Sequence, residues 1–124
     1  MLTVEGADSM RCFLLGAIGY PLLELCWRGR THPSMALAGG LTTLLLGRLQ
    51  RSRLSIVQGA LLGGLAVTGL EALIGCTVNR RHRIWDYRTM PCNWRGQICL
   101  PYTLLWGALC GGTLAFMRAA YKFY

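Results

Sequence analysis

The sequence predicts an all-α integral membrane protein: a four-transmembrane-helix bundle with a polar interfacial connector between the third and fourth helices. Hydrophobic residues make up 53% of the 124 residues and charged residues 15%. A soluble domain of this size cannot bury that much apolar surface, so the excess must face lipid. Arginines fall between four apolar runs, where membrane proteins normally keep them. We therefore expect a single membrane domain over residues 1–124.

The four helices are expected at residues 10–27, 34–49, 54–78 and 98–117. A helix needs about 20 residues to cross the hydrocarbon. The first run lacks the basic start and cleavage site of a signal peptide, so we expect it to remain as an anchor. The second run is short and ends near Arg48, so Arg48 must snorkel or the bilayer must thin. An interfacial or re-entrant second segment is the alternative.

Small residues recur at intervals of four along the apolar runs, and such ridges let membrane helices approach closely. They are Gly39, Thr43 and Gly47, then Gly59 and Gly63, then Gly107, Gly111 and Ala115. A weak internal repeat is also visible, because Leu-Leu-Gly precedes Glu24 and Glu71 at the same spacing. The repeat would make the first two helices a parallel duplicate of the last two, with chance as the rival explanation.

The net charge of +8 would indicate nucleic-acid binding in a soluble chain. Here membrane lipid is the expected partner, and nucleic acid is not. No cofactor or metal is expected, because the six cysteines and two histidines show no metal-ligand spacing. Most of the cysteines are interpreted as small apolar residues. A bridge between Cys92 and Cys99, or between Cys26 and Cys76, stays open.

Two acids lie within the apolar runs, Glu24 near the end of the first and Glu71 about two turns before the end of the third. Because these helices run in the same direction, both carboxyls approach one membrane face. Tyr20 shares a helix face with Glu24, and Thr68 nearly shares one with Glu71. The four residues define a predicted polar pocket, since acids at membrane depth must be protonated, paired or hydrated.

This pocket has two interpretations. The acids either pair with connector arginines and fix the loop, or form a site for a cation, a proton or a polar substrate. A catalytic pair of carboxylates is not favoured, because nothing identifies a substrate or a third group, so no enzyme is expected. The arginines expected to contact lipid phosphate or these acids are Arg28, Arg80, Arg81, Arg83 and Arg95.

The connector over residues 79–97 is too polar to cross lipid. Trp85, Tyr87 and Trp94 suit the headgroup level, and the arginines suit phosphate. The connector is therefore expected either to anchor the bundle as an interfacial belt or to form a selective lid over the acids.

The stretches GLEALIG, VN and IWDYRTMPCNWRGQICLPYTLLW resemble the CmpB-type family of type IV ABC transporters, small bacterial membrane proteins with vertebrate transmembrane relatives. Its W-D-Y-S motif corresponds to Trp85, Asp86, Tyr87 and Arg88, with arginine in place of serine. The other matching residues are Glu71, Gly75, Pro91, Asn93, Gly96, Ile98, Cys99, Leu100 and Trp106, together with Glu24, Arg28 and Gly29. The resemblance implies a multi-helix protein of the bacterial cytoplasmic membrane, but no particular substrate.

We expect a transport or permeation subunit in which Glu24 and Glu71 lie under a lid containing residues 85–88. Four short helices enclose little volume, so a homo-oligomer, most simply a dimer, is expected to build the pathway. The chain has no P-loop, so an ATP-driven role would require a separate ATPase partner. The alternative is a non-transporting module that binds lipid headgroups or a partner protein through the connector.

Overall fold

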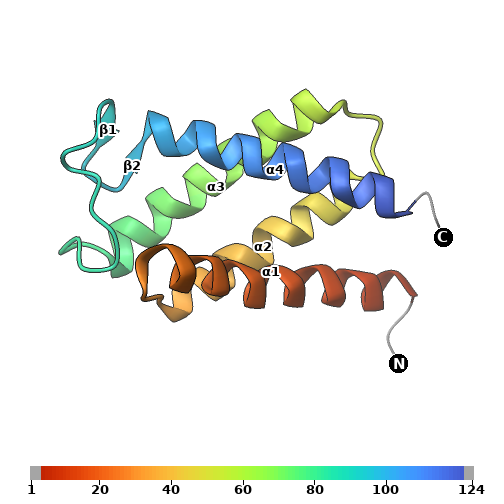
Figure 1. Ribbon diagram of the computed structural model, residues 1–124, viewed down its shortest axis with the longest axis horizontal. Helices are drawn as coiled ribbons and strands as arrows, with labels where there is room; N and C mark the ends of the chain where they lie inside the picture. The colour runs from red at the N-terminus through yellow and green to blue at the C-terminus, as the bar shows by residue number, and fades with distance from the viewer. Residues whose placement is uncertain (1–3, 122–124) are drawn as a thin grey trace.

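The computed structural model describes residues 4–121, which form four helices and one short hairpin (Figure 1). The helices are α1 (Val4–Arg28), α2 (Pro33–Leu49), α3 (Ile56–Val78) and α4 (Leu100–Tyr121), and strands β1 (Asn93–Trp94) and β2 (Ile98–Cys99) lie between α3 and α4. Within α1, α3 and α4, the segments Asp8–Arg28, Ile56–Val78 and Leu100–Ala120 are long and apolar enough to cross a membrane. The prediction of a helical protein with segments suited to a membrane is therefore confirmed.

The second helix, α2, is not one of these three candidate membrane spans. With 17 residues, α2 is shorter than the three candidate spans. Its start is well defined, because Pro33 occupies the first turn and His32 Nδ1 accepts a hydrogen bond from the Ser34 backbone N–H. A fourth transmembrane crossing therefore remains a prediction, and the short length of α2 agrees with the sequence.

Several helix ends differ from the approximate bounds expected. The first helix begins at Val4 rather than at residue 10, and acidic residues such as Asp8 are favourable near a helix N-terminus. The fourth helix begins at Leu100, because Ile98 and Cys99 form β2 and pair with Trp94 and Asn93. A short apolar run before a helix has no periodicity that separates strand from helix.

The helices form two hairpins held by close backbone contacts between glycines. A Cβ on Gly16 of α1 would collide with Gly39 of α2, and a Cβ on Gly64 of α3 would come within 3.0 Å of Gly107 Cα on α4. The expectation that small residues pack helix against helix is met at both contacts.

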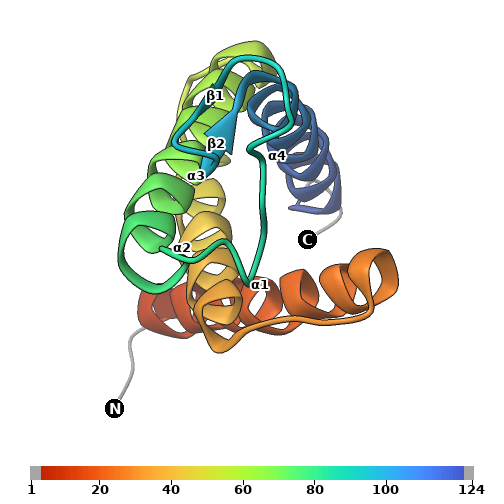
Figure 2. The same cartoon turned by 90° about the vertical axis from the view of Figure 1, so that its left-hand side faces the viewer.

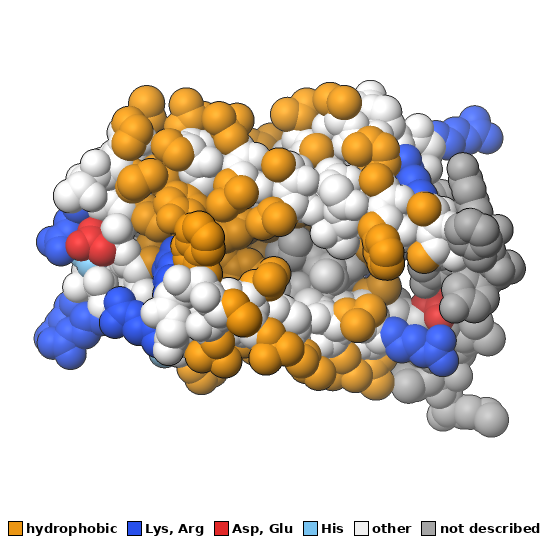
Figure 3. Space-filling model, in the orientation of Figure 1, with side chains coloured by type: hydrophobic (Ala, Val, Ile, Leu, Met, Phe, Trp, Pro, Cys, Tyr) orange, Lys and Arg blue, Asp and Glu red, His pale blue; other side chains and the backbone are white. Residues whose placement is uncertain are grey.

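Charged and apolar side chains are segregated along the bundle. On the face shown in Figure 3, arginines lie toward the two ends, and most of the hydrophobic side chains lie between them. Many large apolar residues are exposed, including Leu15, Leu61 and Phe116 at 70%, 63% and 73%. In water this surface would be unstable, whereas lipid accepts it at no cost.

The connector lies at the end of the bundle where α1 ends and α4 begins (Figure 1), and it crosses from α3 to α4 over that end (Figure 2). The Glu24 end of α1 and the connector were expected on one membrane face, and the described segments agree. A core of Leu46, Val67, Trp106 and Leu114 joins α2, α3 and α4 behind this end.

Candidate functional site

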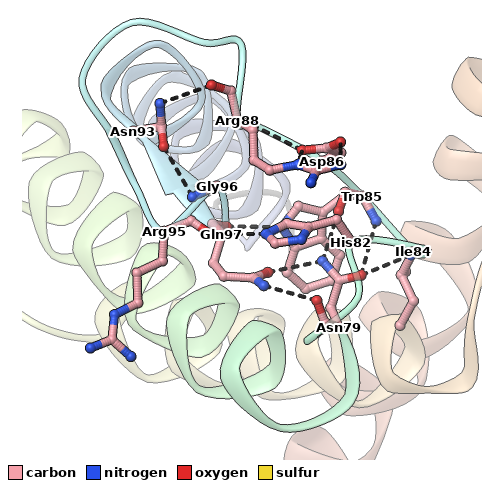
Figure 4. A network of polar contacts seen from close by, with 10 residues as sticks. All are labelled: Asn79, His82, Ile84, Trp85, Asp86, Arg88, Asn93, Arg95, Gly96 and Gln97. Atoms are coloured by element: carbon pink, nitrogen blue, oxygen red, sulfur yellow. Dashed lines mark hydrogen bonds and ion pairs between the residues drawn. The ribbon is translucent and has the colours of Figure 1, made fainter.

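Asn79, at the end of α3, holds the connector together. Its side chain is 1% exposed, and its Nδ2 donates to the Trp85 carbonyl at 2.8 Å and to Gln97 Oε1 at 2.9 Å. Its Oδ1 accepts from the Ile84 backbone N–H at 2.8 Å. Gln97 Nε2 donates back to the Asn79 carbonyl at 2.8 Å. These bonds, drawn in Figure 4, fix both ends of the connector to one buried amide pair.

Trp85 and Tyr87 were expected to face the headgroups, but both side chains are buried inside the protein. They are 4% and 3% exposed, whereas Asp86 and Arg88 are exposed. Burial thus alternates along the WDYR motif, with its aromatic side chains inside the protein and its charged side chains at the surface. Trp85 Nε1 is satisfied by the Gln97 carbonyl at 2.8 Å.

Asp86 and Arg88 form a two-pronged ion pair on the outer side of the motif. Arg88 Nη2 donates to Asp86 Oδ2 at 2.7 Å, and Arg88 Nε donates to Oδ1 at 2.9 Å. These hydrogen bonds lower the pKa of Asp86 to about 2. The arginine that replaces the serine of the related motif thus neutralises the acid beside it.

The hairpin closes through Asn93 and Gly96. Asn93 Nδ2 donates to the Met90 carbonyl at 2.9 Å, and its Oδ1 accepts from the Gly96 N–H at 3.0 Å. Gly96 has a φ of 66°, and a Cβ there would collide with the Arg88 side chain and approach His82 Nε2 at 2.9 Å. Glycine is therefore required here by both conformation and space.

The two membrane acids meet the connector through Tyr87. Glu24 and Glu71 are 8% and 7% exposed. The Tyr87 hydroxyl donates to Glu71 Oε1 at 3.4 Å and accepts from Arg28 Nη2 at 3.4 Å. Tyr20 lies close enough to both carboxyls to feel their charge. Three residues of the predicted polar pocket, Glu24, Glu71 and Tyr20, thus lie near one another. Tyr87 of the connector joins them, with Arg28 at the edge.

Glu24 differs from Glu71 in its surroundings. Among the described residues, no hydrogen-bond donor or cation reaches the Glu24 carboxyl within bonding distance, although its side chain is buried. Arg28, one turn further along α1, contributes a favourable charge without forming an ion pair. A carboxyl in apolar surroundings without a direct partner is costly to keep ionised.

Aromatic rings line the cluster on the α4 side. Tyr102 stacks on Tyr87 with ring centroids 4.6 Å apart, and Trp106 lies 5.9 Å from Tyr102 and 5.8 Å from Tyr20. Trp106 Nε1 is near Glu71, but it meets no acceptor with hydrogen-bond geometry among the described residues. Sequence reasoning gave Tyr102 and Trp106 no place in the pocket, although their spacing of four puts them on one face of a helix.

Thr68 was expected in the polar pocket with Glu71, and in the structure its hydroxyl contacts α4. Its Oγ1 lies 2.9 Å from Thr103 Oγ1 and so joins α3 to α4. Asn79 and Gln97 were also missed as structural centres of the connector, although both lie in the stretches that resemble the family. A polar side chain in a basic loop gives no sequence signal of its burial.

The connector arginines do not reach the acids. Arg80 Nε donates to the Cys76 carbonyl at 3.0 Å, and the Arg95 guanidinium lies 4.8 Å from the Trp94 ring centroid. Arg81 and Arg83 are exposed. In the described part of the chain, it is Arg28 that approaches both acids, through Tyr87 and along α1.

Two cavities meet at this cluster. A mainly apolar groove of about 450 Å³ runs between α1 and α4, over α2, and includes Tyr20, Glu24 and Trp106 in its walls. A more polar cavity of about 610 Å³ lies at the connector end and includes Arg30 and Asp86. Arg28 and Tyr102 line both cavities. Figure 3 shows the face between α1 and α4 hollowed and lined by hydrophobic side chains.

The cysteines and metal-binding groups add no further chemistry to this cluster. All six cysteines, which lie within residues 4–121, are free thiols. The two bridges left open by the sequence are therefore not formed. Within the same residues, no three His, Cys, Asp or Glu side chains are grouped to hold a metal ion.

The helices, the connector and the buried acids define a small helical membrane protein with a polar site at one end of its spans. Residues 31–123 match the model of a family described as "Putative ABC-transporter type IV", and the chain belongs to that family. This confirms the resemblance seen in the sequence. No curated protein and no solved structure matches the chain.

Proposed function

We propose that this chain is a membrane subunit with a transport-related role, and that its Glu24–Glu71 site binds one proton or one monovalent cation. Membership of a transporter-type family supports the role. The observation that carries the site is a charge imbalance. Two buried carboxyls face one guanidinium, that of Arg28. One negative charge is left over, and a proton or a cation removes it.

The groups around the two acids support this charge imbalance. The neighbouring groups from the other packed elements are Tyr87 of the connector and Tyr102 and Trp106 of α4. None of these carries a positive charge, and burial raises the pKa of Tyr87, which keeps its phenol neutral. An uncompensated carboxylate in so apolar a place costs several kcal/mol. Binding a proton or a monovalent cation is the least costly way to balance it.

The polar cavity beside the connector supplies a route to the aqueous side. It reaches the cluster at Arg28 and Tyr87, and Asp86 borders it. The connector would then act as a lid, with Tyr87 as the residue that touches the acid beneath. This extends the lid interpretation of the WDYR motif.

The test is proton flux in liposomes that contain the purified protein, a pH-sensitive dye inside and an imposed membrane potential. We expect the wild type to conduct protons and Glu71→Gln to lose most of that flux. Asp8→Asn is the matched control, because Asp8 pairs with Arg51 at 3.2 Å near the opposite end of α1. Equal flux in wild type and Glu71→Gln would remove Glu71 from the pathway.

We also propose that α2 crosses the membrane to complete a four-helix bundle, and that the pathway is built by a homodimer. One chain with four short helices encloses little space for a continuous path. Any ATP-driven step would depend on a separate ATPase partner. Cross-linking in native membranes followed by mass measurement would test the dimer, and a purely monomeric species would exclude it.

A second candidate function is lipid-headgroup or partner binding by the connector. It is supported by Arg80, Arg81 and Arg83, which are exposed and form no ion pair with a described residue. Neutralising all three to glutamine should release anionic lipid that co-purifies with the wild type. Native mass spectrometry that finds equal lipid on both proteins would contradict this function.

A further inference from the structure

We propose that the groove between α1 and α4 binds a lipophilic organic cation, with its charged group at Glu24 and its apolar body along the groove. The proposal names a substrate class for the Glu24–Glu71 site and therefore rests on the proposed function. The inference combines an apolar cavity with an unpartnered buried acid that lines it.

The groove has the dimensions of a small-molecule site. Its volume of about 450 Å³ lies within the range of roughly 300–1,000 Å³ found for ligand pockets. Along α4 it extends from Tyr102 to Thr113, which is about 16 Å at the helical rise per residue. That is close to half of a hydrocarbon core of about 30 Å. A hydrophobic molecule from one leaflet could therefore enter along its length.

The wall chemistry favours a hydrophobic ligand over water. Leucines from α1 and α4 form much of the lining, among them Leu15, Leu23 and Leu109. The Thr43 hydroxyl, which also lines the groove, donates to the Gly39 carbonyl of its own helix at 2.8 Å. Such back-bonding hides its polarity. The groove therefore offers apolar contact over most of its length.

One end of the groove carries the charge. Glu24 lines this end, is 8% exposed and has no hydrogen-bond or ion-pair partner among the described residues. Tyr20, Tyr102 and Trp106 line the same end, and aromatic rings attract cations over their faces. Glu71 lies close to Tyr20 and Trp106. The two acids therefore outnumber the one guanidinium of Arg28. This end thus suits a cation.

An anionic lipid headgroup is the competing occupant. Arg28 and Arg30 line the polar cavity and could bind a phosphate. The phosphate would, however, have to leave its acyl chain beside Glu24, and Arg28 is already hydrogen-bonded to Tyr87. Asp86 also borders that cavity. The charges thus favour the cation, and the experiment separates the two.

The test uses tetraphenylphosphonium and tetraphenylborate, which have nearly the same shape and opposite charge. Binding of each is measured by equilibrium dialysis against the protein in nanodiscs, with empty nanodiscs subtracted. We expect saturable binding of the phosphonium, at least about tenfold weaker binding to Glu24→Gln, and no saturable binding of the borate. Saturable borate binding, phosphonium binding unchanged in Glu24→Gln, or no binding of either ion would overturn the proposal.

A second pair of variants tests the groove without touching a charge. Gly19 lines the groove, and a Cβ there meets nothing within 4 Å, so Gly19→Leu should fill the groove without disturbing helix contacts. Gly112→Leu is the matched control, because a Cβ there is equally free and Gly112 is exposed on α4 outside the groove. We expect weaker phosphonium binding in the first variant and unchanged binding in the second. Equal binding by both would place the ion elsewhere.

The two proposals can fail separately. Proton flux that depends on Glu71, measured without any added organic ion, supports the proposed function whatever the phosphonium result. If that flux is present and the wild type binds no phosphonium, the substrate class alone is wrong. If flux is absent, the proton site is wrong, and saturable phosphonium binding at Glu24 would still support a cation-binding groove.

Discussion

The Tyr87 hydroxyl lies 3.4 Å from Glu71 Oε1, although Tyr87 belongs to the connector and Glu71 to a helix long and apolar enough to cross a membrane. The same hydroxyl accepts a hydrogen bond from Arg28 at the end of α1. A single phenol therefore joins the first helix, the third helix and the connector. Tyr87 is thus the contact through which the connector meets the charge of Glu71.

Removing this hydroxyl should weaken the link without changing the packing. Tyr87→Phe keeps the ring stacked on Tyr102 but removes the contacts to Glu71 and Arg28. Because both contacts are long, we expect a loss of about 1 kcal/mol in unfolding free energy. Thermal unfolding in detergent measures it, with Tyr102→Phe as the control that should stay close to wild type. Equal melting temperatures for wild type and Tyr87→Phe would show that the two hydrogen bonds of the Tyr87 hydroxyl do not contribute to stability.

Asn79 should be the most sensitive residue of the connector. Asn79→Ala removes side-chain hydrogen bonds to Trp85, Ile84 and Gln97 and leaves buried polar groups unpaired. We expect a destabilisation of about 2–4 kcal/mol, since each orphaned buried group costs about 1–3 kcal/mol. Asn93→Ala, at an exposed position, should cost clearly less. Reversible unfolding in mixed micelles would compare them, and similar losses for both variants would contradict the central role of Asn79.

The contact between α1 and α2 should tolerate no side chain at Gly16. A Cβ there would collide with Gly39 and Thr43, so Gly16→Ala must push the helices apart. Overpacking of this kind costs about 1–3 kcal/mol. Gly19→Ala, on the same helix with nothing within 4 Å of the added Cβ, should be neutral or slightly stabilising. A melting temperature that falls equally in the two variants would show that the collision at Gly16 is not the cause of the loss.

Asp86 should not contribute to any pH dependence of flux near neutrality. Its pKa is lowered to about 2 by Arg88. A carboxyl with a lowered folded-state pKa adds stability that is complete above its ordinary pKa and is lost as the pH falls through about 2. Asp86→Asn should therefore leave the pH profile of proton flux between about pH 5 and 8 unchanged. A profile that moves in this variant would assign the titrating group to Asp86 instead of the membrane acids.

Much of the architecture could be predicted from the sequence because lipid imposes simple rules. Apolar length placed the helices to within a few residues at most boundaries, and glycine spacing located the close contacts at Gly39 and Gly107. The parallel direction of the first and third helices brought Glu24 and Glu71 to one end. These predictions need no knowledge of side-chain packing.

The interior of the connector could not be predicted for a physical reason. Its fold depends on pairings between residues distant in sequence, such as Asn79 with Gln97, which no local pattern reveals. Aromatic residues in a basic loop are typical of the headgroup level, so Trp85 and Tyr87 were placed outside. The buried amides give the loop its own small core, and burial of Trp85 and Tyr87 follows from it.

The protonation of the two membrane acids tests the charge count most directly. The protein, labelled with ¹³C-carboxyl glutamate, would be examined by infrared spectroscopy in nanodiscs at neutral pH with only a bulky, hydrophilic buffer cation present. We predict a band from a protonated carboxyl in the wild type. The band should vanish in both Glu24→Gln and Glu71→Gln, because the remaining acid is then balanced by Arg28. A wild type without a protonated carboxyl, or a band that persists in both variants, would contradict the shared proton.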